Sequence, residues 1–330
     1  MTNSAREGKA TAPAPALELA EGIERWFVEK HAPYTGHIYG VLKTLYKARS
    51  PFQEIEVVEL AYHGKTLILD GKVQSSADSE WIYHEMLVHP VMVSHEKPER
   101  VLIIGGGEGA TAREVLRHKC VKAVEMLEID IMVYNACRTY LPEFNAGAFE
   151  DPRFSLVVGD GRKFIEALSG RRVYDVVIVD ATDPLEGGPA YLLYTREFYE
   201  AVKSVLRPGG MMVTQAEDVS TVPEMATCTI SIYRTARAVF PLVRYYTCWV
   251  PSFDGEWAFV IGSTGPDPAG LGASEVARRL GERGVEGLRY YRPELHQAIF
   301  KLPKYLEELL EGHEGARVIR DGEPIYVFSG

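Results

Sequence analysis

A glycine-rich turn with a carboxylate in its middle lies at residues 101–116, VLIIGGGEGATAREVL. Apolar residues lead into Gly105-Gly106-Gly107, and apolar residues at helical spacing follow, as in strand–turn–helix units that bind phosphate with backbone N–H groups. Glu108 stands inside this turn, where its negative charge would repel a pyrophosphate. The turn therefore predicts a nucleoside ligand that lacks a pyrophosphate and carries a positive charge. By itself, however, GGGEGA also fits the G-x-G-x-x-A pattern of dinucleotide sites.

More carboxylates follow the ends of the next predicted strands, where an open parallel sheet binds its ligand. Glu128 comes about 20 residues after the turn, the place at which a carboxylate holds ribose hydroxyls in dinucleotide-binding proteins. Several unpaired carboxylates packed around one crevice are unfavourable, so the pattern indicates a substrate with positive charge. The acids are Glu128 and Asp130, Asp160, Asp180 and Asp183, and Glu217 and Asp218.

The elements that must position these acids alternate between apolar strands and amphipathic helices from about residue 100 onward. This alternation predicts an α/β fold with a Rossmann-like, doubly wound, mostly parallel sheet. Residues 26–76 alternate apolar and polar positions and predict a small antiparallel sheet, followed by a helix over 77–95 that Asp78 would cap. We expect a disordered tail at 1–20, an N-terminal β-sheet domain at 21–77 and a catalytic domain at 78–330.

Composition excludes several classes of partner. The 330 residues include 36 Lys and Arg against 46 Asp and Glu, a formal charge of −10 that argues against nucleic acid as the partner. No apolar run approaches the ~18 residues of a membrane span. The four cysteines form no C-x-x-C pair or ligand cluster, which indicates reduced, mostly buried thiols in a cytoplasmic protein.

The order of these segments resembles the spermidine/spermine synthase family, whose members are aminopropyltransferases. The resemblance runs from Ser50 to Ser263 and is carried by SPFQEIEVVE, LILDGKVQSSADSEWIYHEMLVHP, VLIIGGGEGATAREVLRH, EIDIMV, VVGDGRKF and YDVVIVDATDP. Within the family, DPLEGGPAYLLYT and VPSFDGEWAFVIGS are most similar to thermospermine synthases. Phe253 stands where spermidine synthases more often have tyrosine.

The resemblance implies that decarboxylated S-adenosylmethionine donates an aminopropyl group to spermidine, giving thermospermine and 5′-methylthioadenosine. It implies no cofactor beyond this co-substrate and no metal, because departure from a sulfonium needs no Lewis acid. Glu108 would attract the bare ammonium of this donor and repel the carboxylate of ordinary methyltransferase ligands. The implied donor-binding residues are Gln53, Gly105, Gly107, Glu108, Glu128, Asp160, Gly161 and Pro189.

The acceptor side follows from the same resemblance. Asp180 matches the family's proton acceptor, which is needed because alkylamines titrate at about 10.4 and attack only when neutral. Asp183 would steer the cationic acceptor. The remaining acceptor-side candidates are Tyr83, His84, Gln74, Gln215, Glu217, Phe253 and Trp257, with Glu186 and Asp218 as additional charges.

Several alternatives stay open. The acceptor could be putrescine, agmatine or norspermidine, with spermidine synthase activity or relaxed acceptor choice. An NAD-dependent oxidoreductase would explain the glycine turn and Glu128, but it leaves Glu108 and DATDP without a purpose. A conventional methyltransferase conflicts with Glu108, and a non-catalytic polyamine-binding protein needs no nucleoside site. The family resemblance further implies a homodimer or a homotetramer.

Overall fold

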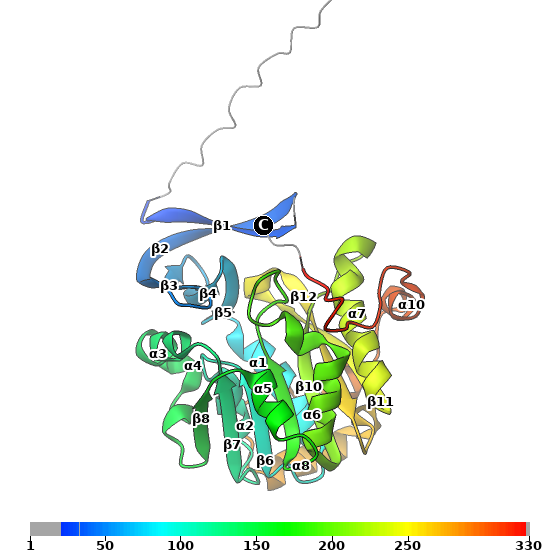
Figure 1. Cartoon of the computed structure of the whole chain (residues 1–330). Helices are drawn as coiled ribbons and strands as arrows, with labels where there is room; N and C mark the ends of the chain where they lie inside the picture. Colours follow the sequence, from blue (N-terminus) through cyan, green and yellow to red (C-terminus); the bar gives the residue numbers. More distant parts are fainter. Residues whose placement is uncertain (1–20, 33, 328–330) are drawn as a thin grey trace, which may run out of the picture.

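Two sheets make up the fold of the computed structural model, which describes residues 21–32 and 34–327 (Figure 1). The tail predicted at 1–20 lies outside the described residues. A small N-terminal sheet, blue in the figure, stands above a larger sheet that is flanked by helices. The predicted pairing of a Rossmann-like, mostly parallel sheet with a small antiparallel sheet is confirmed.

The N-terminal sheet is antiparallel throughout and has the strand order β1-β2-β3-β4-β5. Ile55 and Leu67 on one face pack against helix α3 (Ile131–Tyr140) and its neighbours, while Val58 and Ile68 on the other face belong to a second buried cluster. This packing fixes the small sheet over one end of the larger one. The strands are β1 (Arg25–Ala32), β2 (Thr35–Arg49), β3 (Glu54–Leu60), β4 (Gly64–Leu69) and β5 (Lys72–Ser76).

The larger sheet has seven strands in the order β11-β12-β10-β9-β6-β7-β8. The chain runs outward from β6 through β7 to β8, then returns to the other side of β6 for β9 and β10. This reversal creates a switch point between β6 and β9, where open α/β sheets bind ligands. Only β12 runs antiparallel to its neighbours. The strands are β6 (Arg100–Gly105), β7 (Ala123–Glu128), β8 (Phe154–Val158), β9 (Tyr174–Asp180), β10 (Leu206–Asp218), β11 (Leu242–Val250) and β12 (Gly255–Ser263).

Both faces of this sheet are buried, which explains why its strands read as continuous apolar runs. In β6, Val101 and Ile103 point into one core, and Leu102 and Ile104 point into the other. Helices α1, α2 and α8 cover the first face, and α5, α6, α7 and α10 cover the second. The helices not yet bounded are α1 (Glu80–Ser94), α2 (Ala110–Leu116), α4 (Pro142–Asn145), α5 (Gly161–Ala167), α6 (Arg196–Val205), α7 (Pro223–Val239), α8 (Ala273–Glu282), α9 (Pro293–Ala298) and α10 (Lys304–Gly312), with 3₁₀ turns at Ala148–Glu150, Tyr191–Tyr194, Pro251–Phe253 and Pro268–Gly270.

Two predictions drawn from composition can be compared with this fold. The four cysteines are free thiols and three of them are buried, as predicted. Among the helices of the described residues, none is both long enough and apolar enough to cross a bilayer.

Helix α1 is buried on nearly all sides, and it carries several residues of the site described below. The prediction that Asp78 caps it is wrong: the N-cap residue is Ser79, whose hydroxyl donates to the Asp78 carboxylate (2.9 Å). Pro90 interrupts the helix interior and has no N–H to bond the carbonyl of Met86. The hydroxyl of Tyr246 donates to that carbonyl instead (2.9 Å), so the long buried helix tolerates the proline.

Candidate active site

A cavity lies at the carboxyl ends of β6, β7 and β9, between the two sheets and at the switch point of the larger one. Both sheets contribute to its lining. Most of the residues predicted for the site meet here although they are far apart in the sequence. They are Gln53, Gln74, Tyr83, Gly105, Gly107, Glu108, Glu128, Asp160, Gly161, Asp180, Asp183, Pro189, Gln215, Phe253 and Trp257.

The glycine turn runs directly against two of the acids. At Gly105, where φ is +84°, a Cβ would lie 2.1 Å from the carbonyl oxygen of Asp180. At Gly107 a Cβ would lie 2.6 Å from a carboxylate oxygen of Glu128. Glycine is required at Gly105 by its φ and by the close approach of the Asp180 backbone, whereas a side chain at Gly107 would have to displace the Glu128 carboxylate. The turn therefore lines the cavity with its backbone while Glu108 supplies the side chain.

Asp180, the last residue of β9, is held by two hydroxyl donors. The hydroxyl of Tyr83 donates to Oδ1 (2.8 Å), and the hydroxyl of Thr111 in the first turn of α2 donates to Oδ2 (2.6 Å). Burial raises the pKa of Asp180 to about 6, with the nearby charge of Glu108 acting in the same direction and the two hydroxyls opposing it. Asp180 is therefore a cavity-facing carboxylate that is ionised at neutral pH and able to take up a proton.

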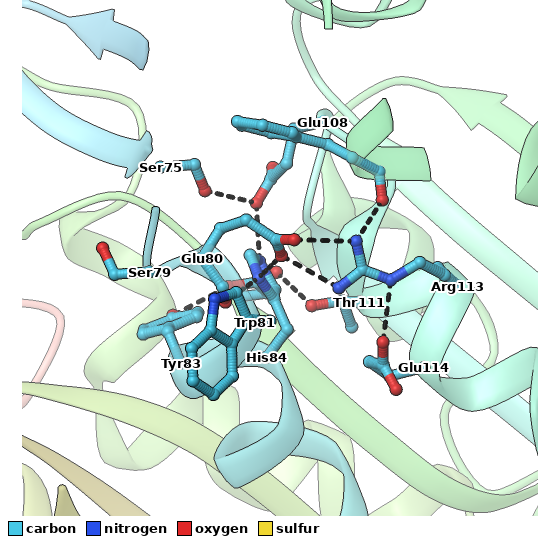
Figure 2. A network of polar contacts seen from close by, with 12 residues as sticks. Ser75, Ser79, Glu80, Trp81, Tyr83, His84, Glu108, Thr111, Arg113 and Glu114 are labelled. Atoms are coloured by element: carbon cyan, nitrogen blue, oxygen red, sulfur yellow. Dashed lines mark hydrogen bonds and ion pairs between the residues drawn. The ribbon is translucent and has the colours of Figure 1, made fainter. Parts of the chain in front are cut away.

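Glu108 is kept ionised by a buried histidine (Figure 2). His84 Nε2 lies 2.8 Å from a carboxylate oxygen of Glu108, which also accepts a bond from the Ser75 hydroxyl (3.3 Å). The other ring nitrogen of His84 lies 2.9 Å from Glu80. Burial acts against both charges, but the hydrogen bonds between the groups prevail: the pKa of His84 is raised to about 10, and that of Glu108 is lowered. The pair is an imidazolium and a carboxylate.

The part of the cavity at the carboxyl ends of β7 and β8 presents a second set of hydrogen-bond acceptors. Glu128 is buried, and burial raises its pKa to about 8 although the backbone N–H of Asp130 donates to it (2.8 Å). The amide of Gln53 donates to Asp130 (3.1 Å), which fixes its orientation at the cavity wall. Asp160 caps helix α5 and accepts the N–H of Arg162 (3.0 Å). Such acceptors suit the hydroxyl and amino hydrogens of a nucleoside.

The opposite end combines aromatic side chains with acids. The rings of Phe253 and Trp257 lie 4.8 Å apart between centroids, and Tyr83 meets Phe253 edge to face at 6.0 Å. Asp183 lines the same cavity, and burial raises its pKa to about 6. Gln215 donates to the carbonyl of Ala181 (3.2 Å). An apolar wall beside carboxylates fits a chain of methylenes that carries ammonium groups.

Comparison with known proteins agrees with this geometry. Residues 80–268 match the spermine/spermidine synthase domain, and residues 25–76 match the spermidine synthase tetramerisation domain. The chain belongs to the spermine/spermidine synthase family.

Named relatives and solved structures of this family cover almost the whole chain. The polyamine aminopropyltransferase of Sulfolobus acidocaldarius is 42% identical over 290 residues, 88% of this chain and 94% of the relative. Polyamine aminopropyltransferase 2 of Hyperthermus butylicus is 46% identical over 288 residues, 87% of this chain and 92% of the relative. A spermidine synthase solved in complex with the transition-state analogue AdoDATO is 31% identical, with a TM-score of 0.79, and covers 90% of this chain and 98% of its own. The spermidine synthase of Thermotoga maritima is 31% identical and gives a TM-score of 0.78 over 90% of this chain and 97% of its own.

Two residues that the resemblance to spermine/spermidine synthases assigned to the acceptor side do not line the cavity. His84 is fully buried behind Glu108, with both ring nitrogens bonded to carboxylates. Glu217 is 2% exposed and lies behind Gln215, whose amide donates to it (2.9 Å). The additional charges Glu186 and Asp218 also lie outside the lining, and Glu186 is exposed to solvent. These positions correct the sequence-based assignment: His84 and Glu217 support neighbouring side chains.

The N-terminal sheet contributes lining residues that were not predicted from the sequence. Glu29 is buried, and its Oε1 accepts the N–H of Val73 (3.0 Å), whereas Oε2 has no hydrogen-bond partner among the described residues. Burial raises the pKa of Glu29 to about 7. His31 and Lys72 lie beside it in the lining. The available signal was the alternation in β1, which turns Glu29 inward in phase with buried Phe27.

Two groups of side chains in the described part of the chain bring potential metal ligands within 4.8 Å of one another. One is Glu29, His31 and His37, and the other is His84, Glu108 and Asp180. In the second group both nitrogens of His84 are engaged by carboxylates, so no lone pair is free for an ion. The absence of a metal from the reaction remains a prediction of the family resemblance.

Proposed function

We propose that this family member transfers the aminopropyl group of decarboxylated S-adenosylmethionine to spermidine, forming thermospermine and 5′-methylthioadenosine. The observation that carries the proposal is the pair of carboxylates of Glu108 and Asp180, whose oxygens lie within 4.8 Å of each other at one cavity wall. His84 supplies one positive charge beside these two carboxylates, so the group as a whole stays negative and would attract a further cation. The donor ammonium and the attacking nitrogen of the acceptor are such cations.

The donor half of the proposal is supported by the glycine turn. Glu108, kept ionised by His84, would bind the ammonium of the decarboxylated donor and repel the carboxylate of S-adenosylmethionine. Glu128 and Asp160 would accept hydrogen bonds from the ribose and the adenine side. The same charge on Glu108 disfavours the pyrophosphate of NAD, which argues against an oxidoreductase.

In the proposed reaction a neutral acceptor nitrogen attacks the methylene carbon next to the sulfonium. The new N–C bond forms as the C–S bond breaks, and the electron pair of that bond stays on sulfur as the thioether of 5′-methylthioadenosine. The acceptor nitrogen becomes neutral by first giving one proton to the Asp180 carboxylate, which Tyr83 and Thr111 hold in place, and after the attack it carries its remaining two protons as a secondary ammonium. The residues of the cavity contribute positioning and a proton acceptor, the two requirements of this substitution.

The acceptor is inferred from the other end of the cavity. Phe253 and Trp257 provide an apolar wall for methylenes. Asp183 and Glu29, whose Oε2 has no hydrogen-bond partner among the described residues and lies 3.7 Å from His31 Nε2, provide carboxylates for distal ammonium groups. A triamine can use both features at once. Apolar contacts distinguish one methylene by only about 1–3 kcal/mol, so putrescine, agmatine or norspermidine would also react, more slowly.

Product analysis tests this function. The purified protein is incubated with decarboxylated S-adenosylmethionine and with putrescine, agmatine, norspermidine or spermidine, each in a separate reaction. Chromatography and mass spectrometry then separate thermospermine from spermine. Thermospermine as the main product supports the proposal. Faster use of putrescine or agmatine, or formation of spermine alone, would refute the acceptor assignment, and binding without any product would indicate a polyamine-binding protein.

We also infer a homotetramer built through the N-terminal sheet. The match of residues 25–76 to a domain described by tetramerisation supports this over a homodimer. In addition, Val28 and Ile38, paired across β1 and β2, are 53% and 50% exposed on the outer face of the sheet. Sedimentation velocity gives the mass directly, and Val28→Lys should shift it to a smaller species. A wild-type protein that sediments as a dimer would contradict the inference.

A further inference from the structure

A chain of buried charged groups continues behind the Glu108–His84 pair into the protein interior (Figure 2). Glu80, one turn before His84 on α1, bonds His84 Nδ1 with Oε2 (2.9 Å). The guanidinium of Arg113 on α2 grips the same carboxylate with two nitrogens, to Oε1 and to Oε2, both at 2.9 Å. The four side chains alternate in charge, from the cavity wall inward: Glu108, His84, Glu80, Arg113.

Arg113 is itself fixed on every side. Its Nε donates to Glu114 (2.7 Å), and Nη1 also donates to the carbonyl oxygen of Phe144 (2.6 Å). Its side chain is only 12% exposed, and that of Glu80 only 9%. A bidentate guanidinium–carboxylate pair has one preferred geometry, unlike a single contact to an ammonium. Glu80 therefore has little freedom to rotate away from His84.

The restriction that Arg113 places on Glu80 affects the cavity through His84. The Nδ1 of His84 lies near the Glu80 carboxylate (2.9 Å) and near the main-chain carbonyl oxygen of Glu80 (2.7 Å). Loss of the carboxylate would leave the carbonyl contact but remove the negative charge that favours the imidazolium, and so would weaken its ion pair with Glu108. The hold of His84 on Glu108 would then weaken, although within the described part of the chain Arg113 has no hydrogen bond or ion pair with Glu108 or with another residue of the cavity lining.

We propose that Arg113 is a positioning residue that, through Glu80 and His84, holds the Glu108 carboxylate in the orientation that binds the cationic tail of the donor. The inference rests on the proposed function, in which Glu108 meets the donor ammonium. The proposal predicts different effects on the two parts of the donor, its nucleoside and its ammonium-bearing chain. The nucleoside part is bound elsewhere in the cavity, so disturbing Arg113 weakens the grip on the ammonium and leaves the grip on the nucleoside intact.

Two ligands measure these parts separately. Decarboxylated S-adenosylmethionine carries the ammonium, whereas 5′-methylthioadenosine has the same nucleoside without the aminopropyl chain. Calorimetry gives the ratio of their dissociation constants. In Arg113→Gln we expect the first ligand to bind roughly 3- to 30-fold more weakly, the range for disruption of a polar network at a distance, while the second is unchanged. Arg113→Lys, which retains the charge without the fork, should fall between the variant and the wild type.

A matched control separates positioning from general support of α1. Arg283 is buried and holds the other end of α1 by donating to the carbonyls of Met92 (2.6 Å) and His95 (2.8 Å). Arg283→Gln should lower the melting temperature without changing the ratio of dissociation constants. An equal change of the ratio in both arginine variants would overturn the proposal, because it would reflect loosening of the helix.

A double-mutant cycle tests the route of the effect. In a Glu108→Gln background, Arg113→Gln should cause no further loss of donor affinity. Full additivity of the two losses of donor affinity would overturn the proposal. So would a ratio of dissociation constants that Glu108→Gln narrows but Arg113→Gln leaves unchanged. If Glu108→Gln itself leaves the ratio unchanged, the donor contact in the proposed function fails first. Should Arg113→Gln not fold, the isosteric Glu80→Gln must narrow the ratio, and a wild-type ratio there overturns the proposal.

Discussion

The hydroxyl of Tyr83 lies 2.8 Å from Oδ1 of Asp180 and donates a hydrogen bond to it across 97 residues of sequence. The bond joins a helix that precedes the glycine turn to the strand end that follows it. Burial and Glu108 raise the pKa of Asp180 to about 6, and the charge of His84, followed by this bond and the one from Thr111, opposes that rise, so the carboxylate is ionised at neutral pH.

Replacement of this carboxylate should remove most of the turnover. Asp180→Asn keeps the shape of the side chain but cannot accept a proton, so we expect kcat to fall by roughly two to four orders of magnitude. The affinity for decarboxylated S-adenosylmethionine should change little, since the donor's nucleoside is bound elsewhere. Steady-state kinetics and calorimetry check both parts. Near-normal turnover would show that another group or water takes the proton.

The acid side of the pH profile should report Asp180. The base is active when deprotonated, so kcat/KM should fall as the pH drops below about 6. Tyr83 donates to the ionised form and lowers the pKa of Asp180, so Tyr83→Phe should move this limb to higher pH. Tyr246→Phe removes a buried hydroxyl that bonds the carbonyl of Met86 and should leave the limb in place. Equal limbs in all three proteins would exclude Asp180 as the titrating group.

Folding stability should fall at alkaline pH because of His84. Its pKa is about 10 in the folded protein and about 6.5 when unfolded, so the folded state binds more protons between these values. This contribution is complete below the unfolded pKa and is lost as the pH rises toward the folded one. Glu29 and Glu128 also lose stabilising free energy as the pH rises. Their folded pKa values are about 7 and about 8, so most of that loss occurs at a lower pH than the loss from His84.

Denaturant unfolding between about pH 8 and pH 10 tests this contribution by comparing the wild type with a histidine variant, because buried groups such as Cys137 and Cys228, whose pKa values burial raises, add to the slope of both proteins. One proton corresponds to a slope of at most about 1.4 kcal/mol per pH unit. His84→Gln should reduce the slope of the wild type by up to this amount. The same slope in both proteins would mean that His84 is neutral when folded.

Glu29 should matter for the acceptor and not for the donor. Glu29→Gln retains an oxygen for the N–H of Val73 and removes the carboxylate that would meet the acceptor. The KM for spermidine should rise by about tenfold, the scale of a lost charged hydrogen bond, with donor affinity unchanged. Glu59→Gln, an exposed acid on the same sheet, serves as the control. Unchanged KM in Glu29→Gln would remove Glu29 from acceptor binding.

Strand periodicity and the acids at strand ends predicted most of the fold and the cavity. Each strand of the larger sheet is an apolar run, and parallel strands bring their carboxyl ends to one edge, so Glu128, Asp160 and Asp180 had to meet. The periodicity of a strand or helix cannot show whether an inward-facing side chain lines the cavity or lies behind the residues that line it. His84 and Glu217 lie behind the lining because their neighbours Glu108 and Gln215 fill the space in front.

The contribution of the N-terminal sheet was harder to predict. Glu29 reaches the cavity only because β3 and β4 pack on α3, a contact between segments that no local pattern connects. Thr111 was missed for a related reason, since its partner Asp180 lies 69 residues further along the chain. The alternation in β1 predicts that Glu29 faces inward, but only the packing of the two sheets shows that it faces the cavity.

The most direct measurement compares the binding of decarboxylated S-adenosylmethionine and S-adenosylmethionine by calorimetry, in the wild type and in Glu108→Gln. The buried, ionised Glu108 should favour the decarboxylated ligand by about tenfold or more, the scale of one charged hydrogen bond, and the substitution should narrow that preference. Equal affinity of the wild type for the two ligands, or preferential binding of NAD, would contradict the assignment of this cavity to an aminopropyl donor.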